Sequence, residues 1–205
     1  LLALYRPGPL QSGMVDDFIN RKNGKEKIEY PHKNLEIILK ETYGVILYQE
    51  QVMKIASYMA NYSLGEADLL RRAMGKKNFA IMRENREKFI QRAVENNYTE
   101  EKADEIFELI DKFAGYGFNK SHSVAYAMIS YWTAYLKAHY PAFYFAAIMT
   151  SEISETGDVA YYFNDAKEHR ISIYPPNVNT PSAYFEIKND GISYSLAAIK
   201  NLGLN

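Results

Sequence analysis

The chain has 205 residues, 47% of them hydrophobic and 24% charged, and a formal net charge of −1. This composition is typical of a folded protein with a core and excludes a polycation, so a nucleic-acid-binding surface would have to be a local patch. The absence of cysteine excludes disulfides and thiol catalysis and fits a reducing compartment, and without an apolar run of about 18 residues no membrane span is predicted.

The two ends indicate a piece of a longer protein. Residue 1 is Leu rather than Met, and the chain starts in the middle of an apolar pattern. At the other end, residues 196–203 read as the beginning of a further helix. We therefore expect an excised part of a larger chain.

The first 45 residues predict short elements. Two prolines in Arg6–Pro9 fix φ and remove donors, so this segment should have no regular structure. A short helix is predicted from Gly13 to Asn20. Another is predicted around Leu35, and it should end at Tyr43-Gly44.

Four longer helices are expected between residues 46 and 113. The first runs from Ile46 to about Asn61, and a capping box of Ser63 and Glu66 starts the second, which ends near Met74. The third spans residues 79–96, and the fourth begins after Thr99. Helical spacing places these side chains inward: Val52, Ile55, Ala56, Met59, then Met82, Phe89, Ile90, Val94, and finally Ala103, Ile106, Phe107, Ile110, Phe113.

Residues 112–123, Lys-Phe-Ala-Gly-Tyr-Gly-Phe-Asn-Lys-Ser-His-Ser, combine glycines, aromatics and polar side chains between two helices. Gly115 and Gly117 permit positive φ and a close approach of the backbone to a ligand. Ser121 or Ser123 can cap the next helix, whose free N–H groups suit an anion. The alternative is a plain helix corner in which the aromatic side chains of the segment are buried as packing anchors.

The last 80 residues predict three helices and a small sheet. The helix at 123–140 carries Tyr126, Tyr131, Trp132 and Tyr135, which could stack on bases, although packing in the core is favoured. Pro141 starts the next helix, over 142–150, and another spans 158–170. Residues 171–176 are extended, and alternation around Asn189-Asp190-Gly191 predicts a β-hairpin. The fold is therefore expected to be mainly α, with a β-hairpin-containing piece at its C-terminal end.

A basic cluster is the strongest charge feature of the chain: Arg71, Arg72, Lys76 and Lys77. One interpretation is a solvated helix end, where the dipole favours cations. However, Arg71 and Arg72 point about 100° apart on a helix, so one of them should lie near the apolar side. Two guanidiniums beside two ammoniums would suit a triphosphate. A Walker phosphate loop is excluded because Leu70 and Lys77 stand where that motif needs Gly and Ser or Thr.

The other reactive side chains predict neither a catalytic centre nor a metal site. The four histidines lack metal-ligand spacing, and His122 is interpreted as a loop hydrogen-bond donor rather than as the partner of a nucleophilic Ser121. Adjacent acids such as Asp16-Asp17 diverge on a helix and cannot converge on two metals.

Several segments, in order, resemble the α subunit of bacterial DNA polymerase III, the C-family of replicative polymerases. The matching pieces are residues 3–19, 43–53, 69–77 with Leu-Leu-Arg-Arg-Ala-Met-Gly-Lys-Lys, 112–127, 136–141 and 175–179. The resemblance implies a fingers domain. Residues 1–20 would be the junction from the palm, 21–170 the helical fingers body, and 171–205 a small β-containing piece leading toward a helix-hairpin-helix region.

The resemblance also implies where the chemistry takes place. In this family the palm precedes the present segment and supplies three aspartates for Mg²⁺, so the chain itself would bind no metal and would be inactive alone as a DNA-directed DNA polymerase. The implied partners are primer-template DNA, dNTPs, the sliding clamp and other replisome subunits, with no membrane, in the cytoplasm. Two other interpretations stay open: a non-catalytic helical nucleic-acid-binding module, and a structural scaffold.

The resemblance assigns roles to nine residues. Those expected to bind the nucleotide are Arg71, Arg72, Lys76, Lys77, Lys120 and His122. Those expected to border the template or nascent base pair are Tyr116, Gly117 and Asn119.

Overall fold

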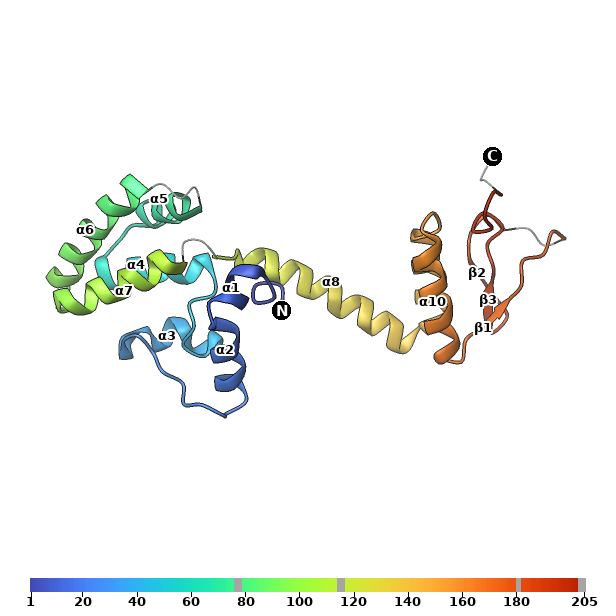
Figure 1. Ribbon diagram of the computed structural model, residues 1–205, viewed down its shortest axis with the longest axis horizontal. Coiled ribbons are helices and arrows are strands. Elements are labelled where there is room, and N and C mark those ends of the chain that lie inside the picture. The colour runs from blue at the N-terminus through green and yellow to red at the C-terminus, as the bar shows by residue number, and fades with distance from the viewer. Residues whose placement is uncertain (76–78, 114–116, 180–181, 203–205) are drawn as a thin grey trace. The chain divides into compact units, whose positions relative to one another are not determined.

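The computed structural model describes residues 1–75, 79–113, 117–179 and 182–202. The chain divides into two compact units, Leu1–Val124 and Ala125–Asn205. Helices dominate and a small sheet lies near the C-terminal end, which confirms the expected mainly-α fold (Figure 1). The functional boundaries at residues 20 and 170 stay predictions.

The first unit is built from helices. Their bounds are α1 Pro7–Gln11, α2 Met14–Lys22, the 3₁₀ turns η1 Lys33–Leu35 and η2 Lys40–Thr42 around α3 Glu36–Leu39, then α4 Gln49–Ala60, α5 Leu64–Gly75, α6 Phe79–Glu95 and α7 Glu100–Phe113. Each helix expected between residues 13 and 113 is present within a few residues of its predicted bounds.

The expectation of an irregular Arg6–Pro9 segment is wrong, because α1 begins there. Pro7 is the first helical residue, and the next turn closes through Leu10 N donating to the Arg6 carbonyl over 3.0 Å. Donors in the first turn of a helix have no intrahelical partner, so prolines at its start remove no hydrogen bond.

The core of the first unit lies where α4, α5, α6 and α7 pack against one another (Figure 1). Every inward position predicted for α4 and α7 is buried. On α6, Met82 and Phe89 are buried, but Val94 is 46% exposed and its neighbour Ala93 is buried instead. Neighbouring helical residues point about 100° apart, so the buried stripe of α6 passes through the smaller side chain.

The predicted capping box at the start of α5 is confirmed. Glu66 N donates to Ser63 Oγ over 3.3 Å, and Ser63 N donates back to Glu66 Oε2 over 2.9 Å. Glu66 also accepts hydrogen bonds from Lys88 (2.7 Å) and Arg92 (3.2 Å) of α6. One carboxylate thus caps α5 and ties it to α6.

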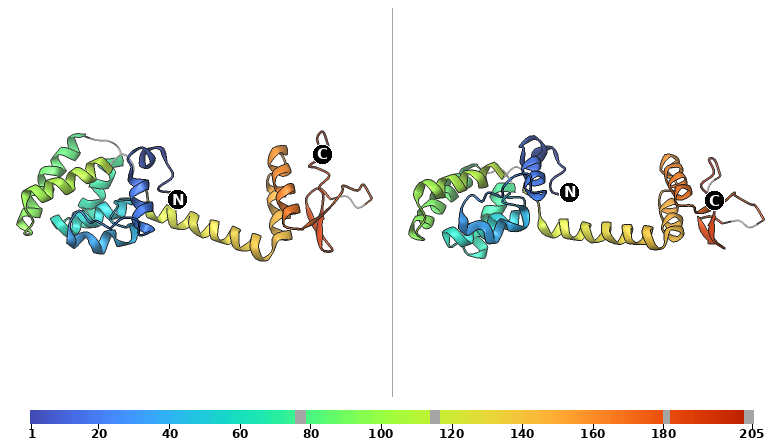
Figure 2. Two further views of the ribbon diagram at one scale, coloured as in Figure 1. Left: turned by 60° about the horizontal axis from the view of Figure 1, so that its bottom comes forward. Right: turned by 90° about the horizontal axis from the view of Figure 1, so that it is seen from below.

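The second unit contains most of α8 Lys120–His139, then α9 Pro141–Ser151 and α10 Thr156–Glu168, and the strands β1 Ser172–Tyr174, β2 Glu186–Lys188 and β3 Gly191–Ser193. The predicted hairpin is confirmed, since β2 pairs antiparallel with β3 through Ile187 and Ile192. The strand order is β1-β3-β2, with β1 parallel to β3. Helices α9 and α10 pack beside this sheet around Phe145, Met149 and Ile192 (Figure 2).

The aromatic side chains of α8 are not core residues, contrary to the favoured interpretation. Tyr126, Tyr131, Trp132 and Tyr135 are between 46% and 64% exposed. Apolar residues occur on every side of this helix, so its pattern has no single inward face. Among the described residues, no helix is long and apolar enough to cross a membrane.

Candidate nucleotide-binding site

Arg71 and Arg72 lie in the last turns of α5 and share one carboxylate. Arg71 Nε and Nη2 lie 2.9 and 2.8 Å from Asp68 Oδ1, and Arg72 Nε lies 2.7 Å from Asp68 Oδ2. The side chain of Arg71 is 31% exposed and that of Arg72 63%. The prediction that one of the two arginines lies nearer the apolar side is confirmed, and that residue is Arg71.

Asp68 is ionised in this arrangement. The hydrogen bond from Arg71, together with the positive charges of both arginines, holds the pKa of Asp68 below its ordinary value of 3.8. The carboxylate engages the Nε edge of each guanidinium, and one negative charge therefore stands against two positive charges. The pair is oriented and still cationic, which is what an anionic ligand requires.

The segment from Gly117 to Lys120 is fastened to the start of α4. Gln49 N donates to the Phe118 carbonyl over 2.9 Å, Phe118 N reaches the Leu47 carbonyl at 3.4 Å, and Tyr48 and Phe118 form an isolated parallel bridge. These backbone hydrogen bonds join two segments that are nearly 70 residues apart in the sequence.

Gly117 has a different reason to be glycine than the sequence suggested. Its φ is outside the left-handed region, so the freedom of glycine to adopt positive φ is not used at this position. A Cβ there would lie 2.9 Å from Phe113 Cε1 and 3.0 Å from Gln49 Cγ. The missing side chain lets the backbone pass close to other side chains of the same unit. Gly115 lies outside the described residues.

Asn119, rather than Ser121 or Ser123, caps α8. Its Oδ1 accepts a hydrogen bond from His122 N at 2.8 Å, and its Nδ2 donates to Glu50 Oε1 at 3.0 Å. Because α8 begins at residue 120, both serines already lie within its first turn and cannot be the cap. The same Glu50 accepts from Lys120 N at 3.0 Å.

Lys120 and His122 are engaged by neighbours within the first unit. The Lys120 ammonium lies 2.7 and 2.6 Å from the two carboxylate oxygens of Glu41 and 5.8 Å from the Tyr48 ring centroid. The His122 ring lies 5.4 Å from the ring of Phe118. A phosphate bound by Lys120 would have to compete with Glu41.

Gln49, which the sequence did not single out, connects the arginine pair to the segment at Gly117. Its Nε2 donates to the Gly117 carbonyl over 3.2 Å, and its Oε1 accepts from Arg71 Nη1 at 3.4 Å. Glu50, the next residue, holds Asn119 and the backbone of Lys120. The only sequence signal was that both side chains stand at a predicted helix start within a segment that resembles the polymerase family.

The structure thus brings together Arg71, Gly117 and, through Glu50, Asn119 and Lys120. Arg72 borders a separate hollow of about 460 Å³ between α5 and α6. Lys76, Lys77 and Tyr116 lie outside the described residues. Within the described ranges, no group of three His, Cys, Asp or Glu side chains is placed to hold a metal ion.

Residues 1–97 match the family model described as bacterial DNA polymerase III alpha subunit finger domain. The whole chain is 53% identical to the DNA polymerase III subunit alpha of Buchnera aphidicola from Schizaphis graminum, and 99% of it is 51% identical to that of Escherichia coli K12. The chain belongs to the bacterial DNA polymerase III alpha subunit family.

The relatives in this polymerase III family extend far beyond the present chain. The chain spans 18% of the length of the Buchnera, Escherichia and Aquifex aeolicus alpha subunits, the last being 53% identical over 99% of the chain. Arg71, Arg72 and Gln49 lie within the match to the finger-domain model. The segment from Gly117 onward lies beyond that match but within the similarity to the complete alpha subunits.

Proposed function

We propose that the chain is the fingers part of a replicative DNA-directed DNA polymerase. In this proposal α5 and the segment at Gly117–His122 bind the triphosphate of the incoming dNTP and the adjoining primer-template DNA. One observation carries it: Asp68 orients Arg71 and Arg72 side by side, and Gln49 links Arg71 to Gly117. Membership of the family supports the reaction class, and the arrangement of the two arginines supports the phosphate-binding role.

The arginine pair would act by positioning the triphosphate and neutralising its charge. Two guanidiniums that share the Asp68 carboxylate can grip phosphate oxygens in planar, directional hydrogen bonds. Charge that develops on the leaving pyrophosphate would be stabilised by groups already oriented for it. Asp68 prepares the pair, because its bonds to the Nε edges limit the rotamers of both side chains.

The roles of the other predicted residues follow from what they contact. Lys120 would exchange Glu41 for a phosphate oxygen, and His122 would donate a hydrogen bond beside it. Asn119 and Gly117 would border the base pair from the start of α8, with Tyr116, while Lys76 and Lys77 would extend the phosphate contacts of α5. The Mg²⁺ of the reaction is assigned to aspartates that precede this segment in the family, so no step here depends on metal ligands of this chain.

The same proposal covers the wider context. In the complete protein the partners would be primer-template DNA, the sliding clamp and other replisome subunits, in the cytoplasm. The present chain alone should give no nucleotide incorporation on a primed template. Measurable incorporation would contradict the proposal that the palm supplies the catalytic aspartates and that the fingers alone are inactive.

The test is steady-state kinetics of the complete enzyme carrying Arg71→Ala or Arg72→Ala. Each change should reduce kcat/KM for dNTP by an amount corresponding to about 1.5–3 kcal/mol, because a charge-assisted hydrogen bond to phosphate is lost. Arg83→Ala is the matched control, since this arginine is 85% exposed on α6 and its ion-pair partner among the described residues is Glu87.

The kinetic constants separate the alternatives. Unchanged values in both variants would remove the pair from the site. A loss of DNA affinity with an unchanged KM for dNTP would favour a plain nucleic-acid-binding module.

A further inference from the structure

The sheet of the second unit has one buried and one open face. Ser193 pairs with Tyr174 on one side and with Glu186 on the other, while Gly191 pairs with Lys188. Paired residues point to the same face of a sheet, so Tyr174, Lys188 and Ser193 share one face. The opposite face carries Ile192, which is fully buried in the core with α9 and α10. The face that bears Tyr174 is thus turned away from the helices.

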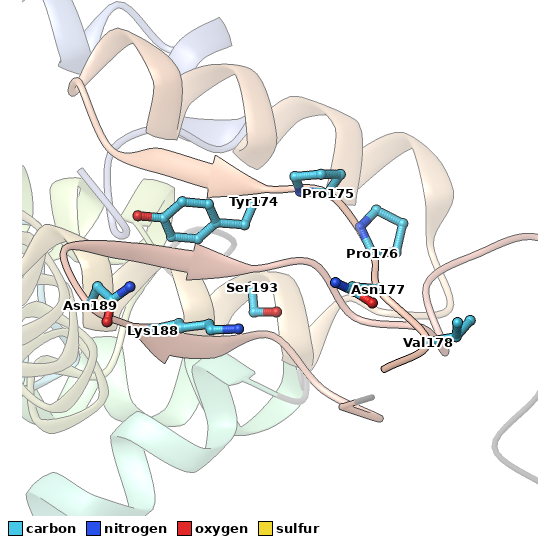
Figure 3. A pocket seen from close by; sticks show the side chains of 8 residues that line it. All are labelled: Tyr174, Pro175, Pro176, Asn177, Val178, Lys188, Asn189 and Ser193. Atoms are coloured by element: carbon cyan, nitrogen blue, oxygen red, sulfur yellow. The ribbon is translucent and has the colours of Figure 1, made fainter. Parts of the chain in front are cut away.

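Tyr174 is held in place on this open face. Its hydroxyl donates to Asp190 Oδ1 over 2.8 Å, and this hydrogen bond raises the pKa of the phenol. A Cβ on Gly191 would lie only 3.0 Å from Tyr174 Cε2, so the glycine makes room for the ring. Figure 3 shows the ring lying along the sheet between β1 and β3. The aromatic surface is therefore preorganised rather than free to rotate.

Polar donors surround a hollow of about 560 Å³ next to this ring. Pro175 and Pro176 form one wall, and Lys188 projects from β2 on the other side (Figure 3). Ser193 and Asn177 also line it, and the Oδ1 of Asn177 already accepts from Asn179 N at 2.9 Å, which leaves its NH₂ to donate outward. The Lys188 ammonium has no ion-pair partner among the described residues.

We propose that this face binds one nucleotide unit of a single-stranded nucleic acid. The base stacks on Tyr174, and the adjoining phosphate is held by Lys188 with Ser193 and Asn177 as neutral donors. The volume is within the range of about 300–1,000 Å³ usual for small-ligand sites. Among the described residues that line the hollow, none carries a carboxylate and Lys188 carries the one positive charge, so its ammonium is available to an anion. In a duplex the base faces are already stacked on one another, and the site therefore selects unpaired strands.

The test measures binding of a fluorescently labelled oligothymidylate to the chain by anisotropy, with Arg71→Ala and Arg72→Ala present throughout. These two changes remove the contribution of the proposed triphosphate site, so that the failure of one proposal does not affect the other. Tyr174→Ala should weaken binding about tenfold, because one stacked base is lost, whereas Tyr174→Phe should retain it. Lys188→Gln should weaken binding and reduce the slope of log K against log salt by about 0.7, the value for one phosphate contact with a single strand.

Two control variants are matched to these changes. Tyr184→Ala removes another exposed tyrosine of the same unit, and Lys200→Gln another exposed lysine, and neither residue lines the hollow. Both should bind as the parent does. If circular dichroism shows that Tyr174→Ala is unfolded, two other measurements test the proposal. The first compares the affinities of Tyr174→Phe and Lys188→Gln, and the second is light-induced crosslinking of a 5-iododeoxyuridine oligonucleotide to Tyr174.

Three results would overturn the proposal. These are no binding of the oligonucleotide by the parent chain at low salt, equal affinity in folded Tyr174→Ala and Lys188→Gln, or equal affinity for a duplex of the same length. If Tyr174→Ala is unfolded, the proposal is overturned when Lys188→Gln binds as tightly as the parent and no crosslink forms at Tyr174.

Discussion

Gln49 is the side chain through which the two halves of the candidate site meet. Its side-chain amide donates a hydrogen bond to the Gly117 carbonyl and accepts one from Arg71. This single side chain therefore connects Arg71 with the segment at Gly117. An apolar side chain of similar size would remove the Gln49 hydrogen bond of the Arg71 guanidinium and leave its bonds to Asp68. Gln49 therefore positions Arg71 in our proposal, and it does not touch the nucleotide itself.

Gln49→Leu in the complete enzyme should reduce kcat/KM for dNTP by about 0.5–1.5 kcal/mol, the usual contribution of a neutral hydrogen bond. The effect should be less than additive with Arg71→Ala, because both changes remove the same contact. Gln91→Leu, an exposed glutamine on α6, is the control. Full additivity in the double variant would show that Gln49 does not act through Arg71.

Gly117→Ala tests the close approach at the start of the same segment. The added Cβ would press on Phe113 and Gln49 at 2.9 and 3.0 Å, so we expect the free energy of unfolding to fall by about 1–3 kcal/mol, as for other overpacked sites. Chemical denaturation measures it. Gly65→Ala, with no atom within 4 Å of its added Cβ, should leave stability unchanged or slightly higher. Equal stabilities for the two variants would rule out steric crowding at Gly117.

At the scale of elements, α4 combines structure and proposed function. Its middle supplies the fully buried Val52, Ile55 and Met59, while its first turn supplies Gln49 and Glu50 to the segment at Gly117. Because the core fixes the helix, the polar side chains of its first turn are presented in a defined place. A site built on a packed helix is held more precisely than one built on loops alone.

Glu66 at the start of α5 should make stability depend on pH. Hydrogen bonds from Lys88, from Ser63 and from Arg92 hold its pKa far below the ordinary value of 4.5. A lowered folded-state pKa stabilises the protein fully above 4.5, and this contribution disappears as pH falls toward the folded-state value. The free energy of unfolding should therefore decrease as acid is added below that pH.

Glu66→Gln isolates this effect, since glutamine also serves at this position of a capping box. The variant should be less stable than the parent at pH 7, and its stability should fall less steeply in acid. Denaturation curves over a pH series would show this difference in slope. Asp68, whose pKa is also lowered, contributes equally to the pH dependence of both proteins and therefore cancels in the comparison. Parallel pH profiles for the two proteins would contradict the role assigned to Glu66.

At the scale of the whole molecule, each unit has a hydrophobic core of its own. Phe89 and Phe107 are buried in the first unit, and Phe145 and Met149 in the second. Separate cores allow the two units to open independently.

Phe145→Ala should destabilise the second unit by about 3–5 kcal/mol, the usual result of truncating a buried aromatic side chain. Amide hydrogen exchange should accelerate in α9, α10 and the sheet, and exchange in α4 and α7 should stay as it is. Phe89→Ala should accelerate exchange in α4 and α7 and leave exchange in α9, α10 and the sheet unchanged. Faster exchange throughout the chain in either variant would mean that the units unfold together.

Local sequence signals predicted the helices, the capping box at Ser63 and the hairpin at Asn189-Asp190-Gly191. These features depend on periodicity and on side chains within a few residues of one another. Predictions failed where two local rules competed. The expectation of an irregular Arg6–Pro9 segment fails because Pro7 also suits a first helical position. The expectation that Ser121 or Ser123 caps α8 fails because Asn119 is an equally good capping residue.

The sequence by itself determined the helical layout, the family and the arginine pair as candidate phosphate ligands, because each is written in contiguous residues. Only the tertiary structure decided that Gln49 joins Arg71 to Gly117, that Glu41 and Glu50 engage Lys120 and Asn119, and that Tyr174 shares an open face with Lys188. These contacts bring together residues from different elements, and no local preference of the chain specifies them. They exist because the packed cores and the strand register place the elements side by side.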